Sequence, residues 1–104
     1  GVILKLDGGG TVWTDESPDY AIQMNGVRGG EAPVAVGMQG TVWLRGDDGW
    51  AAAPGDRPTY QDLHGVWRDP EGAIWSVGGH VSADPLIYGT LVYAGAAPIP
   101  TLEN

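Results

Sequence analysis

Residues 63–79 read LHGVWRDPEGAIWSVGG, which is two short apolar runs separated by a polar turn. The turn is Asp69-Pro70-Glu71-Gly72, and aspartate first, proline second and glycine fourth is the order that suits a type I β-turn. Valine, isoleucine and tryptophan on both sides of the turn favour strands over helices. The stretch therefore predicts a β-hairpin.

Features of this hairpin recur elsewhere in the chain, in the same order. The first anchor is an apolar residue, a polar residue and Gly-Val; the second is a short strand ending in Val-Gly; the third is a glycine followed by an apolar strand. The anchors lie at 24–27 and 63–66, at 34–37 and 75–78, and at Gly1, Gly40 and Gly89. Successive glycine anchors are 39 and 49 residues apart. Four-stranded propeller blades commonly run about 40 to 50 residues, so the repeat predicts an all-β propeller segment.

A second register competes with this one. Residues 10–13 match residues 40–43 letter for letter, at a spacing of 30. Nothing beyond that tetrapeptide aligns, whereas the first register carries three anchors in order, and we keep the first.

The anchors have physical explanations. Gly26 and Gly65 each precede a valine that we expect to face a neighbouring sheet, where a missing side chain permits close approach. Gly37 and Gly78 end a strand, where a positive φ angle is convenient. The repeat anchors are Gly26, Val27, Gly37, Gly40, Gly65, Val66, Trp67, Trp75, Gly78 and Gly89.

The repeat divides the chain into about two and a quarter blades, whose strands we letter A to D from the propeller axis outward. Residues 1–16 hold the C and D strands of an incomplete blade, 17–53 a complete blade, 54–95 a second blade, and 96–104 a tail or edge strand. The strands are expected at about 2–6, 11–15, 24–28, 33–37, 41–45, 50–53, 63–68, 73–77 and 90–93.

Nine strands cannot close a propeller, which normally has four to eight blades. The terminal sheets would then expose apolar faces and unpaired edges. We expect the chain to belong to a longer polypeptide or to form a homo-oligomer. The C–D pair at the start would complete the A–B–C set of a neighbouring copy.

The hairpin at 63–79, with the Gly-Thr that opens the next strand, resembles the blade motif of a broad group of bacterial propellers. That group includes the two-component-regulator propellers, the kelch-like repeats and the photosystem-assembly-factor-like propellers. The resemblance extends to about Gly95. It implies the propeller fold and is nearly silent on activity, because such folds host many functions.

Charge and composition exclude several classes of partner. The net charge is −8 with five basic residues, so no clustered positive charge is available for nucleic acid or for an anionic membrane surface. No apolar run approaches the roughly 20 residues that span a bilayer. The chain has no cysteine, which leaves the compartment open. An extracellular or periplasmic location is favoured, as for a secreted protein.

Five tryptophans invite the interpretation of a sugar-stacking surface. Trp13 and Trp50 are equivalent in the repeat, and Trp67 and Trp75 fit motif positions that pack between blades. We therefore expect the tryptophans to be mostly core.

The second blade carries an insertion in its B–C hairpin, at residues 79–88. Insertions of this kind usually fall on one face, which is often where partners bind. His80, Asp84 and Tyr88 would be the polar contacts of such a site. The alternative is a solvent-exposed loop without a partner.

No catalytic, metal or cofactor site is predicted. His64 occupies a slot matched by Asn25, which favours a structural role, and His64 and His80 are expected at opposite ends of the A–B hairpin. The acid pairs at 15–16 and 47–48 belong to turns. The sequence thus favours a non-catalytic propeller scaffold for protein interaction or self-assembly. The alternative is a glycan-binding propeller that uses the 79–88 loop, and a fragment of a propeller hydrolase is the third option.

Overall fold

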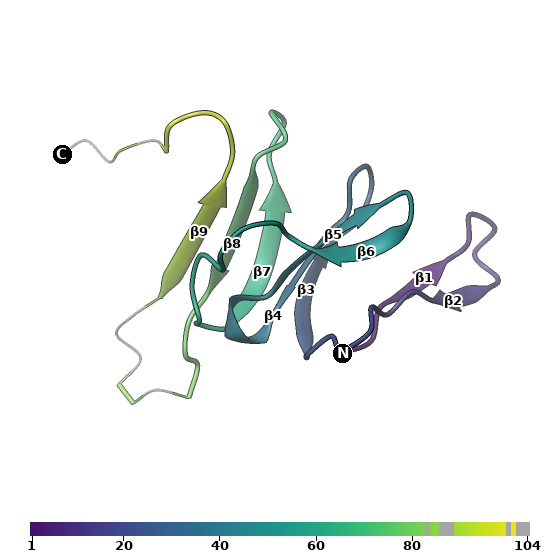
Figure 1. Ribbon diagram of the computed structural model, residues 1–104, viewed down its shortest axis with the longest axis horizontal. Helices are drawn as coiled ribbons and strands as arrows, with labels where there is room; N and C mark the ends of the chain where they lie inside the picture. Colours follow the sequence, from purple (N-terminus) through teal and green to yellow (C-terminus); the bar gives the residue numbers. More distant parts are fainter. Residues whose placement is uncertain (83, 86–88, 100, 102–104) are drawn as a thin grey trace.

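The computed structural model describes residues 1–82, 84–85, 89–99 and 101, and within them the protein is all-β with one short 3-10 turn (Figure 1). The strands form three antiparallel sheets in chain order, which we number sheets 1 to 3. Sheet 1 is β1 (Leu4–Leu6) and β2 (Trp13–Asp15). Sheet 2 is β3 (Met24–Arg28), β4 (Val34–Gly37), β5 (Val42–Gly46) and β6 (Gly49–Ala52). Sheet 3 is β7 (Leu63–Arg68), β8 (Ile74–Gly78) and β9 (Thr90–Ala94).

Strand positions agree closely with the sequence prediction. β3 and β7 have the predicted bounds, and the other strands differ by at most about two residues at either end. The 3-10 turn η1 (Met38–Gly40), between β4 and β5, was not predicted. In the tail, the described residues 96–99 and 101 form no strand.

Sheets 2 and 3 repeat the same pairing. β3 pairs with β4 through a bulge between Met24 and Gly26, and β7 pairs with β8 through a bulge between Leu63 and Gly65. A bulge opposes two residues on one strand to one on the next, so an identical position in two sheets is a specific feature. Sheet 3 therefore has the same bulge as sheet 2, and its first three strands pair in the same order.

The third and fourth strand positions also correspond. Leu6 pairs with Trp13 in sheet 1, and Arg45 pairs with Trp50 in sheet 2. Trp13 thus occupies the same pairing position as Trp50, and not that of Trp43. β9 occupies the third position of sheet 3, beside β8, so the predicted insertion lies in the connection between two paired strands.

Sheets 2 and 3 lie face to face, closest at their first strands β3 and β7 (Figure 1). A Cβ added to Gly26 would lie 2.8 Å from the carbonyl oxygen of His64, so only glycine permits this approach. The side-chain amide of Asn25 donates a hydrogen bond to the carbonyl of Leu63, at 3.1 Å. Val34, Val36 and Leu63 are fully buried at this junction, which is the core of the molecule.

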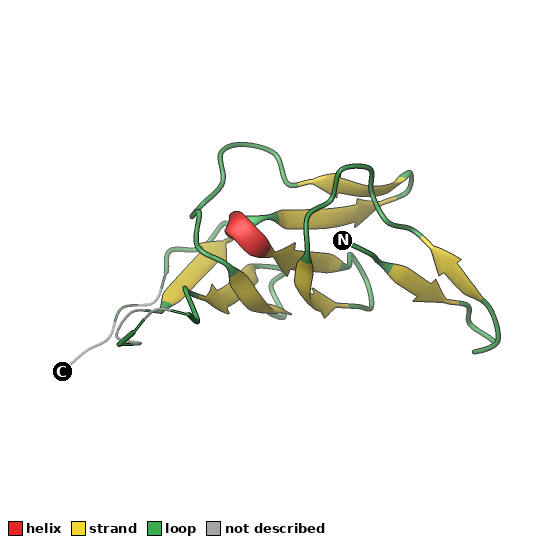
Figure 2. Ribbon diagram, turned by 90° about the horizontal axis from the view of Figure 1, so that it is seen from below, coloured by secondary structure: helices red, strands yellow, loops and turns green. Residues whose placement is uncertain are grey.

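Alternation along the strands gives each sheet two faces, which we name from sheet 2. Its leading face carries Val34, Val36, Val42 and Leu44, and its trailing face carries Ala35, Trp43, Arg45 and Trp50. The corresponding positions define the faces of the other two sheets. The leading face of sheet 2 is turned toward the trailing face of sheet 3. Figure 2 shows the hairpin of sheet 1 and the strands of sheet 3 at opposite ends of an elongated molecule, whose extents are 49 × 33 × 26 Å.

Two predicted explanations for the anchors are wrong. Gly37 has φ −160°, which is extended backbone, and Gly78 also lacks a positive φ. Both are glycine because a Cβ would collide with the backbone carbonyl that precedes the first strand of the same sheet, that of Gln23 or Asp62. Gly40 does have a positive φ, of 70°, and packs against Thr59.

The valines after Gly26 and Gly65 differ in how far they are exposed. Val66 is half-buried on the trailing face of sheet 3, toward sheet 2. Val27 is 65% exposed, which contradicts the expectation that it faces a neighbouring sheet. The reason is that sheet 1 has no described strand opposite β3.

Candidate functional site

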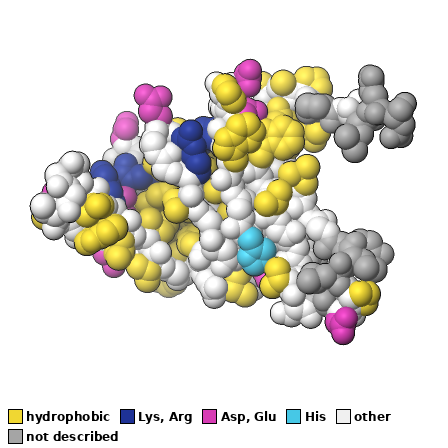
Figure 3. All heavy atoms as spheres, turned by 180° about the vertical axis from the view of Figure 1, so that it is seen from behind, with side chains coloured by type: hydrophobic (Ala, Val, Ile, Leu, Met, Phe, Trp, Pro, Cys, Tyr) yellow, Lys and Arg dark blue, Asp and Glu magenta, His cyan; other side chains and the backbone are white. Residues whose placement is uncertain are grey.

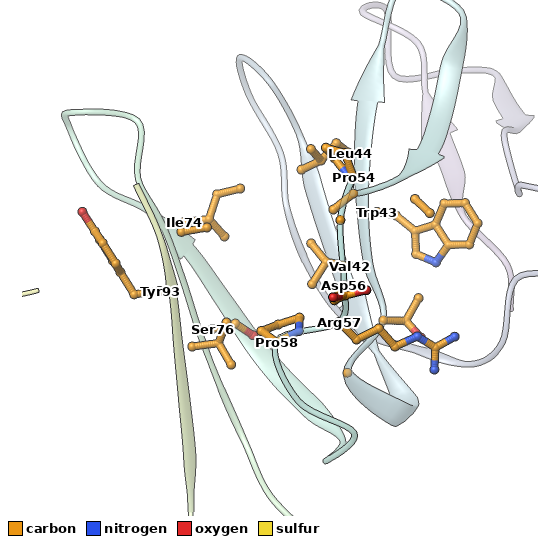
Figure 4. Close-up of a pocket in the computed structure, with 17 residues that line it drawn as sticks. Val42, Trp43, Leu44, Pro54, Asp56, Arg57, Pro58, Ile74, Ser76 and Tyr93 are labelled. Carbon is orange, nitrogen blue, oxygen red and sulfur yellow. The ribbon is translucent and has the colours of Figure 1, made fainter. Parts of the chain in front are cut away.

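A cleft of about 590 Å³ lies between sheets 2 and 3, where the two sheets diverge away from β3 and β7 (Figure 4). It is bounded by β5, by the end of β6 and the segment 53–58 that follows it, and by β8 and β9. Val42, Leu44 and Ile74 point into it, whereas Trp43 points away. The cleft is mainly apolar.

Three of the polar side chains that line the cleft form hydrogen bonds within the chain. The Ser76 hydroxyl donates to the carbonyl of Gly65, and the Thr41 hydroxyl donates to the carbonyl of Met38. The Arg57 guanidinium donates to the carbonyl of Gln39 at 3.2 Å. What the cleft offers a ligand is therefore mainly apolar surface beside the outer edge of β9, together with the Asp56 carboxylate. Sheet 2 has a fourth strand at the corresponding position, β6, and no described strand lies there in sheet 3.

The leading face of sheet 3 carries a row of aromatic rings. Trp67 pairs with Trp75, and Trp75 pairs with Tyr93, so the three side chains lie on one face. The rings of Trp75 and Tyr93 are 4.6 Å apart at their centroids and tilted by 56°. Val77 and Leu91 extend the same face and are 53% and 63% exposed. The face is thus a continuous apolar surface on one terminal sheet.

Asp69 binds one of these rings, that of Trp75. Its carboxylate accepts the indole N–H of Trp75 at 3.0 Å and the backbone N–H groups of Glu71 and Ala73. These hydrogen bonds, led by that of Trp75, hold the pKa of Asp69 below its usual value. The sequence indicates the turn, but it does not indicate that the turn aspartate also binds the tryptophan six residues later.

Sheet 1 presents a second apolar surface, on its trailing face. Val2, Leu4, Leu6 and Trp13 share this side and are 68%, 52%, 41% and 63% exposed. Figure 3 shows hydrophobic side chains both at this end of the molecule and at the sheet 3 end.

Sheet 1 is joined to sheet 2 by a cluster that the sequence did not reveal. The Glu16 carboxylate accepts two hydrogen bonds from Arg45, at 2.7 and 2.8 Å, and one from the Trp50 indole at 3.2 Å. Arg45 is the main cause of the lowered pKa of Glu16, and Glu16 of the raised pKa of Arg45. The interpretation of residues 15–16 as turn acids is therefore wrong for Glu16, whose side chain is 16% exposed.

The tryptophans only partly follow the prediction that they are mostly core. Trp43, Trp50 and Trp75 are half-buried. Trp13 and Trp67 are 63% and 56% exposed, because each lies on the uncovered face of a terminal sheet. Trp67 therefore does not pack between sheets of this chain.

Residues predicted for the 79–88 loop form no site in the described part of the chain. The His80 and Asp84 side chains are exposed, and Tyr88 lies outside the described residues. Leu63 pairs with Gly78, so His64 and His80 lie near the same end of the β7–β8 hairpin and not at opposite ends. The described residues nevertheless contain no group of three potential metal ligands. They also contain no helix with the length and apolarity needed to cross a membrane.

Comparison with protein-family models, with curated proteins and with solved structures finds no match to this chain. A function for this chain is therefore inferred from the arrangement of its own residues.

Proposed function

We propose that this chain is a non-catalytic scaffold of the β-propeller type, in which each sheet is a blade and the terminal sheets bind further blades. Those blades come from the same or from another chain. The scaffold acts in protein interaction or self-assembly.

One observation carries this proposal. The middle sheet has neighbours on both sides, whereas both terminal sheets present uncovered apolar faces. Contiguous apolar surface of this kind marks an interaction site in a soluble protein. The two faces lie on opposite ends of the stack, so one chain can bind two neighbours.

The repeated pairing supports the blade interpretation. The bulges at Asn25 and His64 occupy the same place in sheets 2 and 3, and the first strands lie closest together. The engaged hydroxyls of Ser76 and Thr41 in the cleft support a binding role over a hydrolytic one. No cofactor is needed for such a role.

The test is the molar mass of the purified chain, measured by size-exclusion chromatography with light scattering. We expect a mass that is a multiple of the 10.9 kDa of one chain and that falls on dilution. A folded 10.9 kDa monomer at high concentration contradicts the proposal.

A second candidate function is glycan binding, and the exposed ring of Trp67 beside Trp75 favours it, because aromatic rings stack on sugar faces. The version predicted from the sequence uses the 79–88 loop instead. A glycan array distinguishes the two: Trp67→Ala removes binding at the aromatic row, and Tyr88→Ala removes binding at the loop. An array without binding rules out both.

A further inference from the structure

The sheets of this chain follow a rule about which faces meet. At the junction of sheets 2 and 3, Val42 and Leu44 of a leading face share a cleft with Val92 of a trailing face. Gly26, also on the leading face, abuts the β7 backbone. A leading face therefore meets a trailing face.

The junction of sheets 1 and 2 follows the same rule. Asp15 pairs with Leu4 and lies on the trailing side of sheet 1, so the next residue, Glu16, lies on the leading side. Glu16 binds Arg45 and Trp50, which both belong to the trailing face of sheet 2. At both junctions, a leading face of one sheet thus meets a trailing face of the next.

The faces that stay uncovered are one of each kind. Sheet 3 leaves its leading face free, with Trp67, Val77 and Leu91 more than half exposed. Sheet 1 leaves its trailing face free, with Val2, Leu4 and Trp13 more than half exposed. The chain therefore leaves uncovered one face of each of the two kinds that meet at its internal junctions.

From this we infer that the partner of these surfaces is a second copy of the same chain, bound head to tail. The leading face of sheet 3 in one copy packs on the trailing face of sheet 1 in the next. The inference rests on the proposed function and adds the partner and its orientation. Such a heterologous contact closes into a ring or extends as a filament, depending on the rotation between copies.

The register identifies residues that meet across this interface. Leu91 pairs with Val77 as Val42 pairs with Val36, so Leu91 corresponds to Val42. Leu4 corresponds to Trp43 of sheet 2, and Trp43 in turn to Val92 of sheet 3. Val42 and Val92 line one cleft within the chain. Leu91 of one copy and Leu4 of the next would therefore line the equivalent cleft between the copies.

Leu91→Glu and Leu4→Glu test the orientation, since each places a charge on one of the two faces. We expect each variant alone to be monomeric, because one half of every contact is blocked. An equimolar mixture contains one intact face of each kind and forms a 1:1 dimer. Tyr20→Glu is the matched control, because Tyr20 is fully exposed in the connection between β2 and β3, on neither face, and its variant keeps the wild-type mass.

The alternatives give different results. If the sheet 3 face binds itself, Leu4→Glu dimerises alone and the mixture gains nothing, which overturns the inference while the proposed function stands. A wild-type chain that is monomeric overturns both.

A cross-link keeps the test decisive if a charged variant fails to fold. The chain has no cysteine, so Leu91→Cys and Leu4→Cys introduce single thiols. Packed sheets lie about 10 Å apart and the internal cleft widens that separation at β5 and β9, so the cross-linker is a bis-maleimide with a flexible spacer longer than about 10 Å. We expect cross-linked dimers in the mixture and in neither variant alone. A product from either variant alone, or no product from the mixture, contradicts the head-to-tail contact.

Discussion

Glu16 and Arg45 lie 29 residues apart in sequence, and the carboxylate of the first binds the guanidinium of the second through both oxygens. Paired bonds of this kind are the stronger form of an ion pair because the planar groups match. The Trp50 indole adds a third bond to the same carboxylate. The hairpin of sheet 1 depends on this cluster for its position, because its strands are only three residues long and mostly exposed.

Glu16→Gln should loosen sheet 1 without unfolding sheets 2 and 3. The amide keeps the size of the side chain but removes the charge that Arg45 binds. We expect faster hydrogen exchange at the β1–β2 amides and unchanged exchange in β7–β9. Asp48→Asn, which removes a carboxylate from the turn between β5 and β6, is the control and should leave sheet 1 as it is. Equal protection of sheet 1 in both variants would show that the cluster does not hold it.

The same cluster predicts a dependence of stability on pH. Arg45 lowers the pKa of Glu16 below the usual glutamate value of 4.5 in the folded chain. A lowered folded pKa adds stability that is complete above 4.5 and is lost as the pH falls through the folded value. The wild-type chain should therefore exceed Glu16→Gln in denaturation midpoint at neutral pH, and the two should converge in acid. A difference that is constant with pH contradicts the assignment.

The local parts of the fold could be predicted from the sequence because the signals are local. Asp69 to Gly72 specifies a turn, and the structure has the expected bond from the Gly72 N–H to the Asp69 carbonyl, at 2.9 Å. Gly26 was predicted as a point of close approach, and the neighbouring backbone does lie there.

What depends on neighbouring sheets could not be predicted. Trp13 and Trp50 are equivalent in the repeat, yet one is exposed and the other bonds to Glu16, because only the second has a sheet opposite it. An apolar pattern identifies a face that packs but does not say whether the chain supplies its partner. Glu16 was missed for a related reason, since nothing near it in sequence points to Arg45.

Gly26→Ala should destabilise the junction of sheets 2 and 3. The added methyl group meets the His64 carbonyl oxygen, and overpacking of this kind costs about 1–3 kcal/mol. Gly46→Ala is the matched control, since Gly46 has no atom within 4 Å of an added Cβ and no positive φ. Urea denaturation should give a lower midpoint for Gly26→Ala only. Equal urea midpoints for Gly26→Ala and Gly46→Ala would show that the close contact of Gly26 with the His64 backbone does not contribute to stability.

Trp75→Phe should lower the thermal midpoint of unfolding more than Trp43→Phe does. Trp75→Phe removes the bond to Asp69 and leaves that carboxylate with one donor fewer. Trp43→Phe removes an indole nitrogen that is buried and has no partner in the described part of the chain, so relief of that unpaired group offsets lost packing. We expect a lower thermal midpoint for Trp75→Phe than for Trp43→Phe. The reverse order would mean that Asp69 does not hold the ring.

Leu63→Ala and Leu91→Ala should separate folding from association. Leu63 is fully buried at the junction of sheets 2 and 3, and truncating a buried leucine costs about 2–5 kcal/mol of unfolding free energy. Leu91 is 63% exposed within one chain, so its truncation removes little burial from the monomer. If a second copy covers that face, Leu91→Ala instead weakens association and shifts the mass toward the monomer on dilution. A Leu91→Ala chain with wild-type mass at every concentration would mean that the leading face of sheet 3 is not where copies meet.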